Sequence, residues 1–556
     1  MAISTFPAFA EQADYSLLRS LQMDPNATED GRDHRPRPVF SGHYVPVRPT
    51  AIPDPDYVAH SAELFAELGL DAALAHDPDF QKLFSGDISA ATGPMRPWGW
   101  ATGYALSIYG TEYIQQCPFG TGNGYGDGRA MSVFEGVFQG KRWEMQLKGG
   151  GPTPYCRGAD GRAVLRSSVR EFLAQDFMQA LGVPSSRSLT LFTSHSETVR
   201  RPWYSEQSRS FEPDVMVDNP AAISTRVAPS FLRVGQIELF ARRVRAKAHP
   251  GALDELRLIV DHLIARNYRD EIDATLPFET QVVELARLFR ERLTRLVAAW
   301  MRVGYCQGNF NSDNCAAGGY TLDYGPFGFC ELFNPRFQPW TGGGEHFCFF
   351  NQPQAADANY RMFWSALREL LHDDGSRAEL DALREGFPEA MQEQMDAMWA
   401  SKLGLQQHDD ALLQELLQLL VSSRADYSAA FRRLSRVPET VTDLQDCFYL
   451  PCAPELEPRW NAWLQRWRGM LSAQGSLETA SAAMLQVNPA ITWREWLVAP
   501  AYQQAEQGDY SLIAELQQVF RDPYNDPSDA PGQRMTQLRP RELFNAGGIS
   551  HYSCSS

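Results

Sequence analysis

The sequence predicts an α+β fold of two lobes, in which a glycine-rich small lobe built on strands precedes a mostly helical large lobe with a helical C-terminal extension. Two alternating apolar runs about a glycine turn, at residues 131–138 and 143–148, predict a β-hairpin. Apolar residues recur at spacings of three and four across residues 163–181 and 282–303, which predicts two amphipathic helices. After residue 353 almost every segment has helical periodicity. The chain has 556 residues and is 44% hydrophobic, which is ample for cores of this size.

The balance of charges limits the partners of this protein. Its 51 Lys and Arg residues against 68 Asp and Glu residues leave a net charge of −17, which disfavours nonspecific binding to nucleic acid or to anionic membranes. Any polyanion site must therefore be a local basic pocket. No apolar run approaches about 20 residues, and the N-terminus lacks the pattern of a signal peptide. We therefore expect a cytoplasmic protein without membrane spans.

Nine cysteines are scattered along the chain without a CxxC pair, which is typical of a reducing compartment. We expect most of them to be buried thiols. Cys554 differs from the others because it lies in the polar terminal segment 553–556, where no apolar neighbours would bury it. We interpret Cys554 as a redox candidate.

Changes in composition along the chain predict four parts. Residues 1–95 form an N-terminal extension, rich in proline and charge at its start, which we expect to wrap over the surface in extended form. Residues 96–225 form the predicted small lobe with the nucleotide-binding loop. Residues 226–355 carry the predicted catalytic and metal-binding segment of the large lobe, and residues 356–556 form a helical C-terminal subdomain.

The predicted hairpin carries a site for phosphate groups. The stretch from Gly120 to Gly128 has glycine at every second position and leads to Arg129, and such a loop can direct backbone N–H groups at phosphates. Lys148, at the end of the second strand, would add a fixed positive charge. A flexible turn and a solvated strand-end lysine are the alternative explanations. Asp160-Gly161-Arg162 is a further candidate for a phosphate or ribose contact.

Three more charged residues are candidates for the nucleotide site, and one of them, Glu171, fits the small lobe of a protein kinase. Glu171 lies off the main apolar stripe of the helix predicted at 163–181, where it would pair with Lys148 and orient it. Arg226 and Arg233, seven residues apart, could converge on a phosphate chain by bidentate hydrogen bonds. Each of these residues would otherwise be an ordinary surface charge.

The predicted large lobe carries two acidic motifs ten residues apart. Asp313-Asn314 follows the helix that ends at Gly304, and Asp323-Tyr324-Gly325 follows a strand-like segment. Carboxylate and amide oxygens are the ligands that a magnesium–nucleotide complex needs. A protein kinase separates its catalytic Asp from its Asn and uses Asp-Phe-Gly, so the sequence predicts a protein-kinase-like fold with an altered site. The alternative for Asp313-Asn314 is a hairpin turn.

Periodicity predicts the remaining elements. Further helices are predicted, in order, at residues 58–74, 79–83, 253–265, 360–372, 377–383, 390–403, 410–421, 427–434, 456–471 and 511–520. A strand is predicted at 188–194. The sequence contains no internal repeat, coiled coil or zinc-ligand spacing.

A set of motifs runs in order through residues 95–355 and the C-terminus. It consists of Gly126-Asp-Gly-Arg129, Gln146-Leu-Lys-Gly149, Thr153-Pro-Tyr155, Asp160-Gly-Arg-Ala-Val-Leu-Arg-Ser-Ser168, Arg170-Glu171, Arg226-Val-Ala-Pro-Ser230, Asp313-Asn314, Asp323-Tyr-Gly-Pro-Phe-Gly-Phe329 and Ser553-Cys-Ser-Ser556. Together these motifs resemble the selenoprotein O (SelO, YdiU-like) family. Members of that family have a kinase-like fold but transfer AMP from ATP to Ser, Thr or Tyr hydroxyls of other proteins, with the nucleotide bound in flipped orientation.

The resemblance implies a set of contacts with ATP. These contacts are Gly126, Gly128, Arg129, Lys148, Asp160, Gly161, Arg226 and Arg233. Arg226 and Arg233 would hold the far phosphates, and Glu171 would be the ion-pair partner of Lys148.

The resemblance also implies a metal site and a base. Asn314 and Asp323 would ligate Mg²⁺, or Mn²⁺ in its place, and Asp313 would be the general base. ATP would be the substrate, and the partners would be proteins with acceptor hydroxyls. In-line attack at phosphorus needs positioned charge and a metal more than covalent help, which agrees with these assignments.

The chain departs from the family's pattern at three places. Gln307-Gly308 stands where the family usually has His-Gly, and residues 115–120 and 338–343 differ from its usual segments. These departures concern loop regulation and substrate choice more than ATP binding. Two other classes stay open, a protein kinase that transfers the γ-phosphate and a pseudokinase that binds ATP without turnover.

Overall fold

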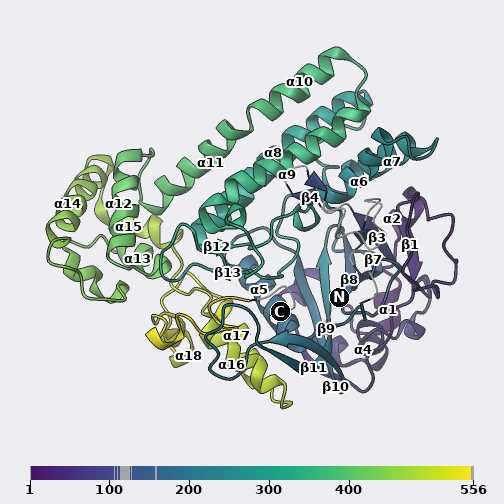
Figure 1. Cartoon of the computed structure of the whole chain (residues 1–556), viewed down its shortest axis with the longest axis horizontal. Coiled ribbons are helices and arrows are strands. Elements are labelled where there is room, and N and C mark those ends of the chain that lie inside the picture. Colours follow the sequence, from purple (N-terminus) through teal and green to yellow (C-terminus); the bar gives the residue numbers. More distant parts are fainter. Residues whose placement is uncertain are drawn as a thin grey trace.

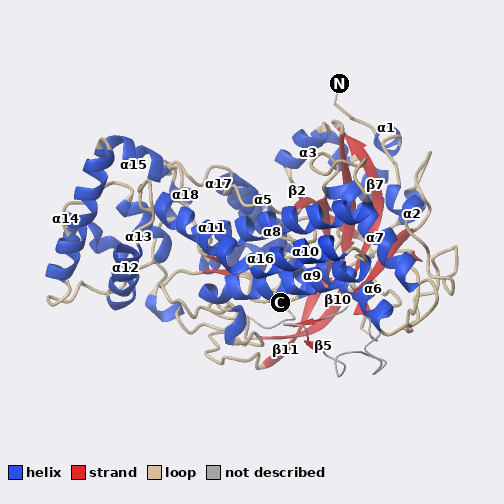
Figure 2. Cartoon of the chain, turned by 90° about the horizontal axis from the view of Figure 1, so that it is seen from above, coloured by secondary structure: helices blue, strands red, loops and turns tan. Residues whose placement is uncertain are grey.

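The computed structural model describes residues 2–104, 107–108, 111–112, 125–126, 128–156 and 159–552. Within this part the chain is a mixed α/β protein with one large antiparallel sheet and many helices. The strands gather at one end of an elongated molecule, and helices from the second half of the chain extend to the other end (Figures 1 and 2). None of the helices in the described residues has the length and apolar character needed to cross a membrane.

The large sheet has the strand order β1-β3-β7-β8-β11-β10-β2, with β6 beside β3 and β9 beside β11. Its strands are β1 (Tyr44–Val47), β2 (Pro55–His60), β3 (Gly99–Tyr104), β6 (Tyr125–Gly126), β7 (Ala130–Phe138), β8 (Lys141–Lys148), β9 (Ala163–Val164), β10 (Arg187–Trp203) and β11 (Val215–Ala228). Two small sheets pair β4 (Ser107–Ile108) with β5 (Thr111–Glu112), and β12 (Tyr305–Cys306) with β13 (Gly328–Phe329).

The predicted hairpin is confirmed as β7 and β8. Phe138 pairs with Lys141 across the turn. The two turn residues, Gln139 and Gly140, have φ angles of 49° and 78°, as in the type I′ turn that matches the right-handed twist of a hairpin.

The strand predicted at 188–194 is confirmed, but β10 is longer than predicted. It continues to Trp203 as one side of a ribbon with β11. Side chains in the extension are mostly exposed and polar, so their sequence carries no apolar alternation. Pairing with β11 keeps this part of the chain extended.

Helices cover both faces of the sheet. The helix α5 (Leu165–Ala180) packs with Leu191 and Ala222 in one core, whereas their neighbours Phe192 and Ile223 enter a second core with the early helices. This division follows from the alternation of side chains along a strand. The early helices of the second core are α1 (Phe6–Ala10), α3 (Ala62–Leu68) and α4 (Pro78–Phe84), whereas α2 (Ser16–Ser20) packs in the first core through Leu17.

The prediction that the start of the chain lies over the surface in extended form is wrong for α1. Phe9 of α1 is fully buried and its ring stacks on Phe134 of the sheet, with centroids 4.6 Å apart. The helix predicted at 58–74 is also too long at its start, because residues up to His60 pair with β10 as the strand β2. Helix α3 begins after Ser61, whose side chain caps it.

The helices of the middle of the chain build the core beneath the sheet. They are α6 (Val234–Arg245), α7 (Ala252–Asn267), α8 (Phe278–Val303) and α9 (Gln352–Leu367). α8 ends at Gly304 in a left-handed conformation, as its sequence predicts. α6 was not predicted, and α9 begins eight residues before the helix predicted at 360–372.

The predicted helical C-terminal region is confirmed. It contains α10 (Asp374–Glu385), α11 (Phe387–Lys402), α12 (Asp410–Ser422), α13 (Tyr427–Leu434), α14 (Glu457–Gln474), α15 (Leu477–Leu485), α16 (Glu495–Ala505), α17 (Ser511–Phe520) and α18 (Ala530–Met535). Its core includes three fully buried tryptophans of α14, Trp460, Trp463 and Trp467. The seven cysteines in the described residues are buried, as predicted for most of them, and Cys117 and Cys554 lie outside these residues.

Candidate active site

Lys148, the last residue of β8, faces α5. It is 7% exposed, and its Nζ contacts Oε2 of Glu171, which is 1% exposed. Because α5 is buried on nearly every side, a carboxylate on this helix needs a cation beside it. Burial raises the pKa of Glu171; the charges of Lys148 and Arg226 oppose this rise, whereas Asp323 adds to it.

Asp323 joins this pair from a distant part of the sequence. Its Oδ1 lies 3.3 Å from Lys148 Nζ, and its Oδ2 accepts a hydrogen bond from Arg226 Nη1. Arg226, in β11, is fully buried, and its Nη1 lies 3.6 Å from Glu171 Oε1. Lys148, Glu171, Arg226 and Asp323 therefore form one group, which we call the charged cluster.

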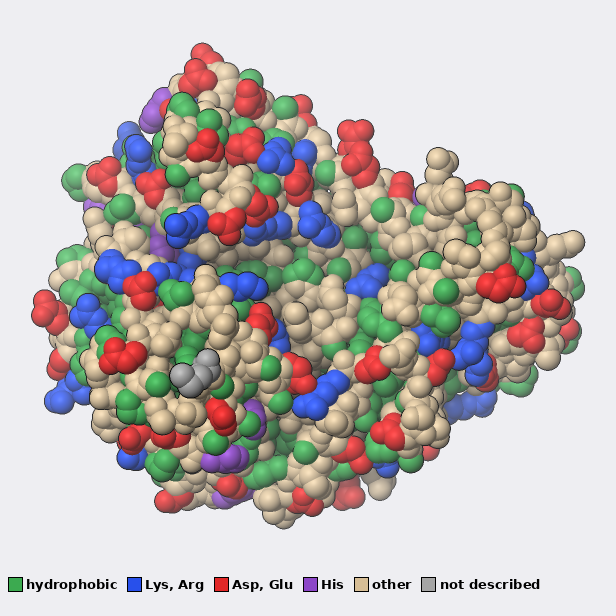
Figure 3. Space-filling view, turned by 180° about the vertical axis from the view of Figure 1, so that it is seen from behind, with side chains coloured by type: hydrophobic (Ala, Val, Ile, Leu, Met, Phe, Trp, Pro, Cys, Tyr) green, Lys and Arg blue, Asp and Glu red, His purple; other side chains and the backbone are tan. Residues whose placement is uncertain are grey.

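The electrostatics of Asp323 reveal further positive charge around the charged cluster. Burial alone would raise the pKa of Asp323, but the charges of Lys148, Arg226, Arg233 and Arg129 outweigh burial and hold it well below its usual range. Four cations thus act on a site with two carboxylates, and an excess of positive charge in a buried site favours an anionic ligand. Basic side chains also gather along a hollow of the surface seen from behind, although the whole chain is acidic (Figure 3).

Gln146 fixes Arg226 from the side of β8, a contact that sequence reasoning missed. Arg226 Nη2 donates to Gln146 Oε1 at 2.5 Å. Gln146 Nε2 in turn donates to Ser132 Oγ at 3.3 Å, and the Ser132 hydroxyl donates to Glu144. Alternation puts Glu144, Gln146 and Lys148 on one face of β8, so the sequence held a signal for this contact.

The predicted catalytic loop follows β12. It contains a short 3₁₀ helix, η4 (Ser312–Asn314), in which Asp313 is half-buried. Asn314 Nδ2 donates to the carbonyl oxygen of Asn309 at 3.1 Å. The side-chain oxygens of Asn309 and Asn311 are buried and have no hydrogen-bond partner within the described residues. The loop therefore offers several oxygen atoms within a few residues of one another.

Arg233 lies beside this loop. Its backbone forms a β-bridge with Ala316, two residues after Asn314. Its guanidinium carbon lies 4.6 Å from the ring centroid of Tyr104, and the side chain is 4% exposed. Arg233, which precedes α6, thus lies beside the predicted catalytic loop, and its charge acts on Asp323.

Gln307, at one of the departures from the family's pattern, contacts the segment that is predicted to bind the metal. Its Nε2 donates to the carbonyl oxygen of Asp323 at 2.9 Å, and its backbone N–H donates to Gln352 Oε1 at 2.9 Å. Tyr305 donates its hydroxyl hydrogen to Gln307 Oε1 at 2.5 Å. The side chain at this departure therefore still fixes the backbone of Asp323.

Arg170 supports the same segment from α5, and sequence reasoning assigned it no role. Its Nη2 donates to the carbonyl oxygen of Phe327 at 3.0 Å, and its Nε donates to Glu495 at 3.0 Å. The ring centroid of Tyr552 lies 4.2 Å from its guanidinium carbon. Tyr552 also exchanges backbone hydrogen bonds with Pro339 and Thr341, so the end of the described chain packs against the segment that follows Asp323.

Comparison with known proteins assigns the chain to a family. Residues 34–521 match the family model described as Protein adenylyltransferase SelO. This chain belongs to the SelO family. Proteins named Protein nucleotidyltransferase YdiU from Aromatoleum aromaticum and Xanthomonas campestris pv. campestris are 34% and 36% identical to this SelO-family chain, over 98% of it and 99% of their own length. The chain is therefore a nucleotidyltransferase, and the resemblance found in its motifs is confirmed.

The predicted glycines of this SelO-family chain occupy tight positions. Gly126 pairs with Gly103 of β3 through the backbone. A Cβ added to Gly128 would lie 2.8 Å from Cys156 Cα, and one added to Gly161, where φ is 71°, would lie 2.1 Å from the carbonyl oxygen of Gly151. Larger residues would therefore displace the backbone at both positions. Residues 120–124 and 127 of the predicted glycine loop and the redox candidate Cys554 lie outside the described residues.

Asp160 is not joined to the charged cluster by a hydrogen bond. Its Oδ1 accepts from Arg201 Nη2 at 2.6 Å and from the backbone N–H of Arg162 at 2.9 Å. Burial raises the pKa of Asp160, but the hydrogen bonds and the charges of Arg201 and Arg129 lower it overall. Arg129 therefore lies within electrostatic range of both Asp160 and Asp323.

Three residues with side-chain oxygens are the predicted holders of a metal that would be shared with a nucleotide. Asp313, Asn314 and Asp323 supply the carboxylate and amide oxygens that Mg²⁺ prefers. The described part of the SelO-family chain has no group of three or more His, Cys, Asp or Glu side chains that could hold a metal. A metal here would need phosphate and water oxygens to complete its shell, as Mg²⁺ does when it binds with substrate phosphates.

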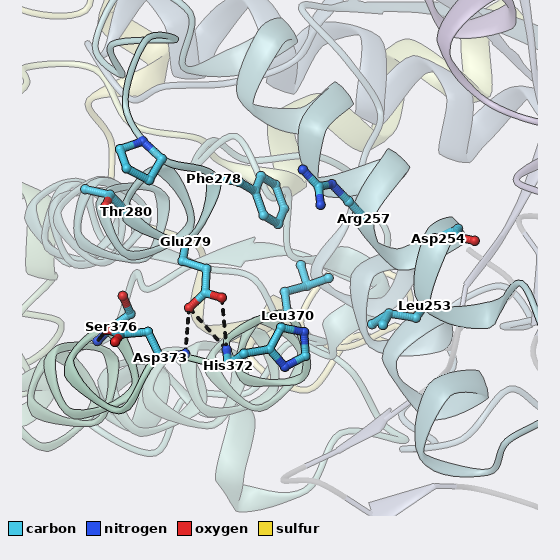
Figure 4. A pocket seen from close by; sticks show the side chains of 11 residues that line it. Leu253, Asp254, Arg257, Phe278, Glu279, Thr280, Leu370, His372, Asp373 and Ser376 are labelled. Carbon is cyan, nitrogen blue, oxygen red and sulfur yellow. Dashed lines mark hydrogen bonds between the residues drawn. The ribbon is translucent and has the colours of Figure 1, made fainter.

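A cavity of about 480 Å³ lies elsewhere in the SelO-family chain, between α7, α8 and the start of α10 (Figure 4). Glu279 accepts hydrogen bonds there from the backbone N–H groups of His372 and Asp373, at 3.1 and 3.0 Å. The guanidinium carbon of Arg257 lies 4.2 Å from the ring centroid of Phe278. No residue of the charged cluster is among the described residues that line this cavity, so we do not assign the nucleotide to it.

Proposed function

We propose that this chain transfers AMP from ATP to the hydroxyl group of a Ser, Thr or Tyr side chain in an acceptor protein and releases pyrophosphate. The observation that carries this proposal is the action of four cations, Lys148, Arg226, Arg233 and Arg129, on the single carboxylate of Asp323. A triphosphate is an anion that such a set of charges can bind through charge-assisted hydrogen bonds. The family match supports nucleotide transfer.

In this proposal Arg226 and Arg233 hold the β- and γ-phosphates, and Lys148, oriented by Glu171, adds a third contact with the phosphate chain. The α-phosphorus then faces the acceptor. The hydroxyl oxygen bonds to the α-phosphorus as the bond to the β-phosphate breaks, and pyrophosphate leaves. Asp313 takes the hydroxyl proton as general base. The contacts of Arg226 with Gln146 and Asp323 support this reading, because a buried guanidinium held in place loses little freedom on binding.

We assign Asn314 and Asp323 as ligands of Mg²⁺, and Mn²⁺ suits the same oxygen atoms. When bound, the metal would neutralise phosphate charge. Asp323 pairs with Lys148 and Arg226 in this structure, so these cations would turn to the phosphates when nucleotide and metal enter. The lowered pKa of Asp323 keeps its carboxylate ionised and ready to ligate.

We also propose that the architecture is protein-kinase-like. The small lobe would be residues 96–225 and the large-lobe catalytic segment 226–355, with an N-terminal extension at 1–95 and a helical subdomain at 356–556. An ion pair between a strand-end lysine and the helix that follows it is the arrangement that protein kinases use, which supports this division.

Parallel reactions with ATP labelled at the α- or the γ-phosphate test the proposal. We expect protein label from the α-phosphate alone, an AMP-sized mass increment on a hydroxyl side chain, and pyrophosphate in solution. Protein label from the γ-phosphate together with ADP would instead show a protein kinase. ATP binding without label from either position would show a pseudokinase. Chelation of divalent metal, followed by addition of Mg²⁺ or Mn²⁺, tests the metal assignment.

A further inference from the structure

A groove of about 430 Å³ opens between α9, α11 and α12, where the helical C-terminal region meets the middle of the chain. Its apolar floor is formed by Met301, Phe350, Phe387, Met391, Met395, Trp399, Leu413 and Leu417. A volume of this size is within the range of about 300–1,000 Å³ that is usual for ligand sites. The groove can therefore receive apolar groups of a partner.

The rim of the groove is acidic. Asp357, Asp396 and Asp410 line it, and none of the described lining residues is Lys or Arg. Asp357 is neutralised by Arg384, at 2.9 Å. Asp396 and Asp410 lie 3.6 and 3.9 Å from Nε2 of His408, and the side chain of Asp410 is 77% exposed. A partner with positive charge beside its apolar groups would complement this rim.

One side chain links the groove to the candidate active site. Gln352, the first residue of α9, donates from Nε2 to the sulfur of Met301 in the groove floor, at 3.6 Å. Its Oε1 accepts from the backbone N–H of Gln307, at 2.9 Å, and Gln307 in turn holds the backbone of Asp323. Three consecutive hydrogen bonds therefore connect Met301 in the groove floor with Asp323, through Gln352 and Gln307.

We propose that this groove is a docking site for the acceptor protein, which binds it with an amphipathic segment that has Lys or Arg beside its apolar side chains. The inference rests on the proposed function, because it takes the partner to be the protein that receives AMP. A second copy of this chain is disfavoured as occupant because each copy carries a net charge of −17. Anionic lipids and nucleotides are disfavoured by the carboxylates of the rim.

The first test measures binding of a labelled synthetic helix to the full chain by fluorescence anisotropy, without ATP. The probe has leucines along one face and lysines beside them, and two control peptides replace the lysines by glutamate or the leucines by serine. We expect the first peptide to bind at least about tenfold more tightly than either control, a difference of about 1.4 kcal/mol. Equal binding of all three peptides would overturn the proposal.

Substitutions place the binding in the groove. Leu417→Lys adds a positive charge to the groove wall and should weaken binding of the lysine peptide about tenfold. Val421→Lys is the matched control, because Val421 is on the same helix and 46% exposed but does not line the groove. Asp396→Asn combined with Asp410→Asn should weaken binding without removing apolar surface. Equal effects of Leu417→Lys and Val421→Lys would overturn the assignment.

The second test uses α-labelled ATP and a mixture of acceptor proteins. Leu417→Lys should lower label on acceptors at low acceptor concentration, while pyrophosphate release without acceptor protein, in which water takes the AMP group, stays unchanged. Loss of both reactions would show that the groove supports the active site alone, and would overturn docking. Peptide binding needs no ATP, so a failure of the proposed AMP transfer would leave the first test intact. A wild-type dimer that Leu417→Lys dissociates would make a second copy the occupant and would likewise overturn the proposal.

Discussion

Lys148 and Lys402 are both buried lysines, one in the charged cluster and the other in the helical C-terminal region. Lys148 is 7% exposed, and its ammonium group lies against the carboxylates of Glu171 and Asp323. The carboxylates thus compensate the positive charge of Lys148 within the protein. If Asp323 ligates a metal, as we propose, Lys148 can turn to an anionic ligand.

Lys402, at the end of α11, is 1% exposed and has neutral partners. Its Nζ donates to the carbonyl oxygen of Arg302 at 2.7 Å and to Asn488 Oδ1 at 2.9 Å, and it lies 4.0 Å from the ring centroid of Phe431. Burial lowers the pKa of Lys402 well below its usual range, and the nearby charge of Arg302 lowers it further.

The difference teaches that burial alone does not identify a functional lysine. Lys402 satisfies backbone and amide oxygens between helices, whereas Lys148 belongs to a site with more cations than carboxylates. We propose that positive charge clustered around a carboxylate, and not burial, is the feature that separates the two regions.

The largest effect is expected from Asp323→Ala, which would break the charged cluster at its centre. The substitution removes a proposed metal ligand and the carboxylate shared by Lys148 and Arg226, so transfer from ATP should fall by about 10³-fold or more. Magnesium-dependent ATP binding, measured by calorimetry, should weaken in parallel. Unchanged turnover in this variant would refute the site assignment.

Paired substitutions at the two lysines test the comparison itself. Lys148→Met should lower transfer by about 100-fold with the fold intact, because Glu171 keeps Arg226 as a neighbour and its raised pKa lets it take up a proton. Lys402→Met should leave transfer within about twofold of wild type. Activity and circular dichroism of both variants check this. A greater loss of activity in Lys402→Met than in Lys148→Met would reverse the assignment.

The dependence of stability on pH should distinguish Lys402. Its folded pKa lies below its unfolded value near 10.5, so the unfolded chain binds a proton that the folded chain holds weakly. The stability associated with this lysine is therefore full above pH 10.5 and is lost as pH falls toward the folded pKa. As pH falls below about 10.5, wild type should lose up to about 1.4 kcal/mol per pH unit relative to Lys402→Met, until the folded lysine takes up a proton. Urea unfolding of both proteins measures this difference, and parallel curves would contradict the prediction.

A smaller loss of activity than in Lys148→Met is expected from Gln146→Leu, which removes a hydrogen-bond partner of Arg226 and leaves the charge of Arg226 in place. Arg226 would lose its partner on β8, and transfer should fall by about tenfold, as for other residues that orient a binding group. Ser132→Ala, one hydrogen bond further from Arg226, should cost less. Steady-state kinetics with varied ATP check both variants. Wild-type activity in Gln146→Leu would show that Asp323 alone positions Arg226.

The amino-acid sequence by itself determined the local elements and the family. Three local patterns could be recognised in the sequence, because each depends on neighbours within a few residues. They are the alternation of β7 and β8, the apolar stripes of α5 and α8, and the end of α8 at Gly304. The ordered motifs were sufficient to place the chain in the SelO family. The exposed extension of β10 and the strand β2 were not visible, because pairing with a distant strand holds them extended and their side chains carry no apolar pattern.

The tertiary structure alone decided which charges meet. Lys148 and Asp323 are 175 positions apart, and Arg226 and Asp323 are 97 apart. Gln146 contacts Arg226 and Gln307 contacts Asp323 only because folding brings the sheet and the loop after β12 together. Electrostatic attraction and hydrogen bonding depend on distance in space and not on separation along the chain, so folding had to bring these groups together before their roles could be recognised.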